Sequence, residues 1–287
     1  MVLIWGSFPV AAKIGVENAP PLLFSGTRFC LAFVIMAVIA LLQRKSLRIT
    51  PQQHLQVCGV SLCMVGIPSS IFFAAAPYAP VGILTLMWSM SPIFTALFNS
   101  GGHGELRGWR LLVSLCVGAV GVLIVLLGHI PFVGGSANDG LSFAASGPAL
   151  IAELAVLGSS VIYGLGLFLA KRSAPAMPVV TLTTWQMFYS GIFIVLVGLV
   201  AEHGMPIQPG WIALADLLYL TIFCGCITFL LTFWLIRRIG AIRIAYADFI
   251  IPGITLVLSY FILGENLTPA KLGGLVLVTL SVILVAA

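Results

Sequence analysis

Long apolar runs, each close to 20 residues and separated by short polar segments, constrain this chain more than any other feature of its sequence. A helix of about 20 apolar residues spans the hydrocarbon core of a bilayer. Only 7% of the residues are charged, against about 25% in an average soluble domain. A water-soluble enzyme and a disordered chain are therefore excluded, and unbroken runs do not fit the alternating strands of a membrane β-barrel. The sequence predicts an all-α membrane protein.

Charged residues, prolines and glycines divide the chain into ten expected transmembrane helices. The expected ranges are 1–16, 22–43, 54–76, 80–100, 108–128, 148–171, 178–201, 211–236, 241–263 and 269–287. With both termini in the cytoplasm, ten of the 13 basic residues fall at inner loops or inner helix ends, as the positive-inside rule requires. The sequence thus predicts a multi-pass protein of the cell (inner) membrane with cytoplasmic termini.

The two halves of the chain resemble each other. The segment from Trp5 to Lys13 aligns with the segment from Tyr163 to Lys171 at an offset of 158 residues. We therefore expect a first repeat over 1–128, an outer connector over 129–147, and a second repeat over 148–287. Because each repeat has five helices, the second copy must be inverted in the membrane. Inverted repeats are typical of alternating-access transporters.

The ends of these repeats resemble a known family. The stretch from Trp5 to Pro9, with Lys13 and Arg28-Phe29 after it, resembles the opening of an EamA-type repeat of the drug/metabolite transporter (DMT) superfamily. The stretch from Pro252 through Leu263-Gly264-Glu265 is similar to the end of such a repeat, and the first repeat departs from this pattern by reading His103-Gly104-Glu105. The resemblance covers the whole chain. It implies a ten-helix exporter with a central cavity, mostly from helices 1, 3, 4, 6, 8 and 9, with helices 5 and 10 at the periphery.

Two ionisable residues inside apolar runs are candidates for substrate binding, because a charge inside a membrane is costly. Asp248 is interpreted either as a group that binds a substrate amine or a proton, or as a partner of the helix-end residues Arg243 and Arg238. Arg28 is interpreted either as the partner of a substrate carboxylate, or as a partner of Glu17 or of backbone carbonyls.

Other acids are expected to have structural roles. Glu105 and Glu265 are each expected to cap the helix that follows, and Lys271 to lie near Glu265. Glu153 and Asp216 are expected to lie near the N-terminal ends of their own helices, with a proton relay as the alternative.

Aromatic residues and prolines complete the predicted site. The aromatic candidates for substrate binding, for which a packing role is the alternative, are Trp5, Tyr78, Trp88, Tyr163, Trp185 and Tyr246. Prolines interrupt helical hydrogen bonding, and prolines at matching depth in both halves mark expected hinges. The expected hinge residues are Pro9, Pro68, Pro92 and Pro252.

We interpret the chain as a secondary active transporter that exports small organic metabolites, amino acids or related amphipathic compounds, by alternating access. The expected partners are a small-molecule substrate, membrane lipid, and a proton or counter-substrate for coupling. No catalytic residue, metal site, cofactor or nucleic-acid partner is predicted, since no histidine pair has ligand spacing and no nucleotide-binding loop is present. The alternatives are a DMT transporter of a nucleobase, nucleotide-sugar or cationic drug, an integral-membrane enzyme on lipid substrates, and a passive channel.

Overall fold

The structure, a computed structural model, describes residues 1–100, 109–127, 147–173, 177–205, 210–240, 244 and 250–286, and these residues form helices and connecting turns without a β-strand. The π-helical segments carry the label η. The helices are α1 (Val2–Asn18), α2 (Pro21–Leu42), α3 (Pro51–Ser61), η1 (Leu62–Gly66), α4 (Ile67–Ala75), α5 (Val81–Trp88), α6 (Ser91–Ser100), α7 (Trp109–Leu127), α8 (Gly147–Ser173), α9 (Val179–Ala201), α10 (Trp211–Tyr219), η4 (Leu220–Ile227), α11 (Thr228–Ile239), α13 (Ile250–Leu263) and α14 (Pro269–Ala286).

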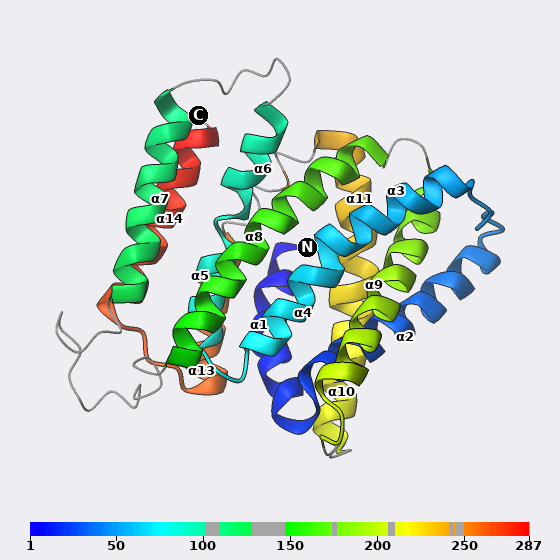
Figure 1. Cartoon of the computed structure of the whole chain (residues 1–287), viewed down its shortest axis with the longest axis horizontal. Helices are drawn as coiled ribbons and strands as arrows, with labels where there is room; N and C mark the ends of the chain where they lie inside the picture. The colour runs from blue at the N-terminus through cyan, green and yellow to red at the C-terminus, as the bar shows by residue number, and fades with distance from the viewer. Residues whose placement is uncertain are drawn as a thin grey trace.

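The helices are those of a multi-pass membrane protein. In the described part of the chain, six helical segments are long and apolar enough to cross a membrane: 21–42, 51–75, 81–98, 147–172, 179–201 and 211–239. Two shorter apolar helices cover 250–263 and 269–281. The long helices α7, α8 and α9 run alternately down, up and down in Figure 1. The count of ten membrane helices and the inversion of the second half stay predictions.

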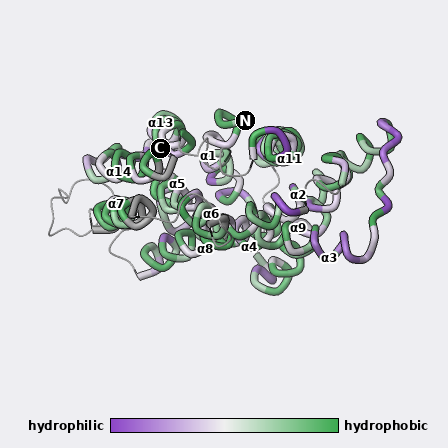
Figure 2. The backbone as a smooth tube through the Cα atoms, turned by 90° about the horizontal axis from the view of Figure 1, so that it is seen from above, coloured by the Kyte–Doolittle hydropathy of each residue, from purple (hydrophilic) through white to green (hydrophobic). Residues whose placement is uncertain are grey.

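Polar sequence lies between the helices. Seen from above in Figure 2, the connection between α2 and α3 is hydrophilic and projects from one end of the molecule. Thr50 and Gln53 form a capping box there, in which each side chain accepts a hydrogen bond from the other residue's backbone N–H. This reciprocal capping satisfies backbone donors where α3 begins.

Glycines allow close helix packing. The helices α2 and α9 pack closely at Gly26, where an added Cβ would lie 2.6 Å from Val195, and at Gly191, where it would lie 2.9 Å from Cys30. At the other edge of the molecule, α7 and α14 lie side by side (Figure 1). An added Cβ on Gly121 would lie 3.0 Å from Leu277. Small residues at helix crossings are characteristic of membrane bundles. The edge position of α7 and α14 agrees with the peripheral place that the family resemblance implies for helices 5 and 10.

Interruptions of the α-helical hydrogen-bond pattern recur at corresponding places. The π-helical segments η1 and η4 begin at Leu62 and Leu220, so they are 158 residues apart (220 − 62), which is the offset of the sequence repeat. The span over 81–100 is broken between Trp88 and Ser91. Pro92 accounts for this break, because it cannot donate the helical bond to the carbonyl of Trp88.

Two glutamates connect the predicted halves at helix N-termini. Glu202, just after α9, accepts hydrogen bonds from the backbone N–H groups of Leu22 (2.7 Å) and Leu23 (2.9 Å), at the start of α2. Glu265, after α13, accepts them from Val81 (2.7 Å) and Gly82 (3.3 Å), at the start of α5. The expectation that Glu265 caps the following helix is therefore wrong. The free N–H groups at the start of α5 bind it instead, because its loop brings it to that helix end.

The expected neighbour of Glu265 is present, since Lys271 Nζ lies 3.8 Å from its carboxylate. The expectation for Glu105 falls outside the described residues.

Candidate central cavity

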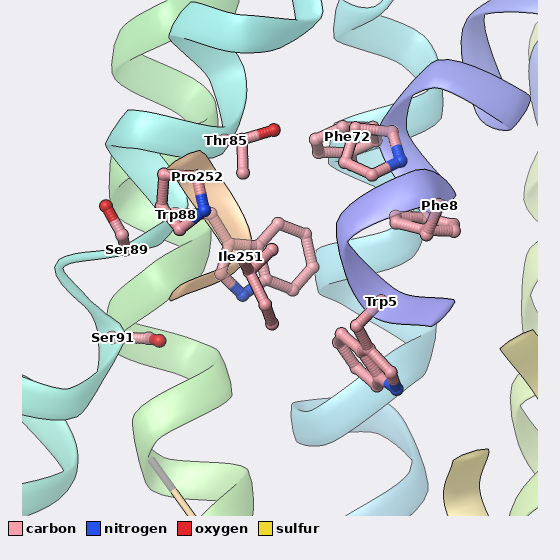
Figure 3. A pocket seen from close by; sticks show the side chains of 10 residues that line it. Trp5, Phe8, Phe72, Thr85, Trp88, Ser89, Ser91, Ile251 and Pro252 are labelled. Atoms are coloured by element: carbon pink, nitrogen blue, oxygen red, sulfur yellow. The ribbon is translucent and has the colours of Figure 1, made fainter. Parts of the chain in front are cut away.

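Two adjoining narrow cavities lie inside the helical bundle, and Trp5, Phe8 and Trp88 line both of them. Figure 3 shows the first cavity, with the Trp88 and Ile251 side chains between α5 and α1. The first is also lined by Pro9, Phe72, Thr85, Ser89, Ser91, Ile251 and Pro252. The second is also lined by Arg28, Phe29, Met64, Val65, Ser69, Cys224 and Phe229. Each cavity has a volume of about 30 Å³, which is room for roughly one or two water molecules and too little for a metabolite. A metabolite therefore needs these walls to move apart.

Five aromatic side chains form a closed ring of neighbours around this region. The ring centroids are 6.4 Å apart for Trp5–Phe8, 5.4 Å for Phe8–Phe72 and 5.6 Å for Phe72–Trp88. The circuit closes through Trp88–Tyr163 at 5.5 Å and Tyr163–Trp5 at 6.4 Å. Such spacings fit edge-on and tilted aromatic contacts. The aromatic ring, so defined, offers flat apolar faces from α1, α4, α5 and α8.

Arg28 brings a positive charge to the second cavity. Its side chain is 3% exposed, and its guanidinium donates a hydrogen bond to Ser69 Oγ at 3.1 Å. The guanidinium carbon lies 4.1 to 5.1 Å from the ring centroids of Phe29, Phe73 and Phe8. These rings stabilise the cation through their π-electrons. Of the partners that the sequence suggested, Glu17 is exposed and forms no ion pair with Arg28.

Three hydrogen-bonding groups that line the cavities have no partner in the described structure. They are Trp5 Nε1, Arg28 Nε and the hydroxyl of Ser91. Trp5 Nε1 and Arg28 Nε can only donate a hydrogen bond, and the Ser91 hydroxyl can donate one. Buried donors without partners are costly. The cavities are therefore suited to a ligand that supplies acceptor oxygens, such as a carboxylate.

The predicted hinge prolines lie next to cavity residues. Pro9, Pro68 and Pro92 each stand four positions after a cavity-lining residue, namely Trp5, Met64 and Trp88. Because proline has no N–H, each removes the helical bond to the carbonyl of that residue. Pro252 lines the first cavity directly. The cavities thus lie where the backbone is interrupted, which is where membrane transporters place their sites.

Two predicted site residues lie away from these cavities. Tyr78 follows α4 in a turn and is 53% exposed. Trp185 donates its indole N–H to the carbonyl of Leu47 at 2.9 Å and packs edge-on against His54. The structure therefore places Trp185 beside the polar connection that precedes α3. Tyr246 and Asp248 lie outside the described residues.

Several cavity residues were not singled out from the sequence. Phe8 was identifiable because it stands between Trp5 and Pro9, and Ser91 because it directly precedes Pro92. Phe72, Ser69 and Phe229 had no local signal, since phenylalanine and serine are common throughout the apolar runs. Within the described residues, no group of three or more His, Cys, Asp and Glu side chains could hold a metal ion.

The known proteins that this chain resembles are transporters. The EamA-like transporter family matches residues 1–127 and 150–287. The uncharacterized transporter YvbV of Bacillus subtilis is 25% identical over 99% of this chain and 88% of its own. An S-adenosylmethionine/S-adenosylhomocysteine transporter of Chlamydia muridarum is 24% identical over 94% of this chain and 84% of its own. A probable amino-acid metabolite efflux pump of Salmonella typhimurium is 24% identical over 97% of this chain and 89% of its own.

The fold has a counterpart among solved structures. One crystal structure of a protein matches 99% of this chain and 92% of its own with a TM-score of 0.68. Its sequence identity is 18%, so the likeness concerns the fold alone.

Proposed function

The chain belongs to the EamA-like transporter family of the DMT superfamily, and on that premise we propose that it exports small amphipathic metabolites, amino acids or compounds related to them, as a secondary active transporter. Its membrane is the cell (inner) membrane. The central cavity is the substrate site. Substrate crosses by alternating access, with the walls of the cavity opening to one side of the membrane at a time.

One observation carries this proposal: apolar aromatic faces and unpaired hydrogen-bond donors line the same buried space. The aromatic ring suits the apolar part of a substrate. The guanidinium of Arg28, with Ser69 beside it, suits a carboxylate. An amphipathic metabolite with one carboxylate has both parts.

The names of the relatives favour the same chemical class. One is named for S-adenosylmethionine and S-adenosylhomocysteine, and another for amino-acid metabolites. S-adenosylmethionine carries an α-amino acid group, so the two names share a carboxylate next to an amine. This shared group supports Arg28 as the anchor of the substrate.

A ligand-binding experiment tests the assignment. Purified protein in detergent is heated with amino acids, S-adenosylmethionine, nucleobases, sugars and cationic drugs, since a ligand of the folded state raises its apparent stability. Compounds that carry an α-amino carboxylate should raise the melting temperature of wild type and have little effect on Arg28→Gln. Stabilisation by cationic drugs or nucleobases alone would favour the alternative cargoes, and would contradict a carboxylate anchor.

The ten-helix inverted topology is part of the proposal. The separate family matches over 1–127 and 150–287 support two repeats, as does the 158-residue offset between η1 and η4. If both termini are cytoplasmic, cysteines introduced as Ser46→Cys and Gly240→Cys should both react with an impermeant reagent from the cytoplasmic side. A cysteine at Asn138 should react from outside. Labelling of positions 46 and 240 from opposite sides would contradict the inversion.

A further inference from the structure

The turn between α4 and α5 lies between two opposite charges that come from other parts of the bundle. Lys13 of α1 donates a hydrogen bond from its ammonium group to the carbonyl of Ala76, at the C-terminal end of α4. Glu265, after α13, accepts hydrogen bonds from the N–H groups of Val81 and Gly82 at the start of α5. Each charge is opposite in sign to the partial charge of the helix end that it contacts. The turn clamp, formed by these two contacts, holds both ends of the turn, which lies at the lower end of the bundle in Figure 1.

The turn clamp lies one helical turn beyond the wall of the first cavity. Three of its residues, on three helices, each stand four positions from a cavity-lining residue of the same helix. The pairs are Pro9 and Lys13 on α1, Phe72 and Ala76 on α4, and Thr85 and Val81 on α5. Residues four positions apart lie on the same face of a helix. Figure 3 shows Phe72 and Thr85 at one end of the cavity, away from Trp5 and Ser91, so the turn clamp lies across this end.

Nearby charged groups leave these contacts in place. In the part of the chain that the structure describes, no acid lies within 4.0 Å of the Lys13 ammonium, although Glu17 stands one turn further along α1. Lys271 lies 3.8 Å from the Glu265 carboxylate and donates a hydrogen bond to the carbonyl of Asn266. Lys271 therefore holds Glu265 in position from its own segment, while the hydrogen bonds of the carboxylate go to α5.

We propose that the turn clamp is the gate on the outer side of the cavity, and that Lys13 and Glu265 are positioning residues for transport because they hold this gate closed. The inference rests on the proposed function, in which α1 begins in the cytoplasm and ends outside. For a substrate to leave outward, the α4–α5 turn moves away from α1 and α13, and both contacts break. Water then hydrates the ammonium and the carboxylate, and these new bonds offset most of those that are lost.

Access to the cavity from outside tests this gate. The reporter is the thiol of Ser89→Cys, because Ser89 lines the first cavity and is 4% exposed. Intact cells that express the protein are treated with an impermeant thiol reagent, and mass spectrometry of the peptide that carries position 89 separates the reporter from the native cysteines. Lys13→Met and Glu265→Gln should each raise the rate of modification by about tenfold, as the loss of a hydrogen bond to a charged group predicts.

Glu202→Gln is the matched control, because Glu202 makes the same kind of contact with the start of α2 and is not part of the turn clamp. It should lower Tm as Glu265→Gln does, and leave the modification of Ser89→Cys unchanged. Lys13→Arg should keep the wild-type rate, since a guanidinium also donates to a carbonyl. If Glu265→Gln does not fold, Lys13→Met decides, because Lys13 is only half-buried. No rise in the variants that fold, or an equal rise in Glu202→Gln, would overturn the proposal.

The same assay separates the gate from the proposed function, because no substrate is added. A rise in modification from both sides of the membrane, measured in intact cells and in inside-out vesicles, would indicate loosened packing and overturn the gate. A rise from the cytoplasmic side alone would confirm the gate and contradict the orientation of the proposed function. Failure of amino acids to bind would count against the proposed substrate and leave the result on the gate unchanged.

Discussion

Glu202 provides the most quantitative test of how the two predicted halves are held together. Pro21 has no N–H, and the N–H of Phe24 already binds the carbonyl of Pro20 at 2.9 Å. The N–H groups of Leu22 and Leu23 are thus the donors that α2 leaves free at its start, and Glu202 accepts both. With a residue exposure of 6%, Glu202 is shielded, so water replaces these bonds poorly.

The expected loss follows from this geometry. An unsatisfied buried donor costs about 1–3 kcal/mol, so Glu202→Ala should lower the free energy of unfolding by about 3 kcal/mol. Glu202→Gln keeps one acceptor oxygen and loses the favourable charge at the helix N-terminus. Glu202→Gln should therefore lower the free energy of unfolding by about 1.5 to 2 kcal/mol.

The assay is thermal unfolding of the purified protein in detergent, with hydrogen exchange of the peptide that covers the start of α2. At about 2–4 °C for each kcal/mol, Glu202→Ala should lower Tm by about 6 °C or more. The amides of Leu22 and Leu23 should exchange faster, by roughly tenfold for each 1.4 kcal/mol. Glu17→Ala is the control, because Glu17 is an exposed acid near the end of α1. If Glu202→Ala melts and exchanges like Glu17→Ala, the carboxylate does not hold α2 as described.

Three further predictions concern α5, the contact of α1 with α10, and the cavity. Glu265→Gln should lower Tm by about 3–6 °C, because it weakens the same kind of contact at the start of α5. A Tm within about 1 °C of the wild-type value would contradict this prediction. Gly15→Ala should destabilise the folded protein by about 1–3 kcal/mol, because the added Cβ overpacks the contact of α1 with α10. Gly59→Ala is the control and should be neutral in the same melting assay, because nothing lies within 4 Å of its added Cβ. Equal effects of the two substitutions would contradict the packing described. Trp88→Ala should weaken binding of L-phenylalanine by about tenfold in a titration, since it removes one wall of both cavities, while unchanged affinity would place the substrate elsewhere.

Much of the fold could be predicted because each signal was local. An apolar run of 20 residues predicts a membrane helix from composition alone, and Pro92 predicts the break that separates α5 from α6. The π-helical segments were not predicted, since no residue type specifies them. Their 158-residue spacing becomes visible only in the structure.

The candidate site was harder to predict, because depth in a helix does not say which way a side chain points. Trp5 and Trp185 are both indoles inside apolar runs, yet the first lines both cavities and the second binds the carbonyl of Leu47. Glu265 was assigned to the following helix by sequence proximity, whereas its partners Val81 and Gly82 are more than 180 residues away. Such partners depend on tertiary packing, which no local pattern encodes.

Counterflow in proteoliposomes tests the central claim most directly. Vesicles that contain the purified protein are loaded with unlabelled L-phenylalanine, L-methionine or S-adenosylmethionine and diluted into a trace of the same labelled compound. The account predicts transient accumulation of label for at least one of these compounds, and its loss in Arg28→Gln protein that is folded and reconstituted equally well. Absence of accumulation for all three, or accumulation that Arg28→Gln leaves unchanged, would contradict a carboxylate substrate held at Arg28 in the central cavity.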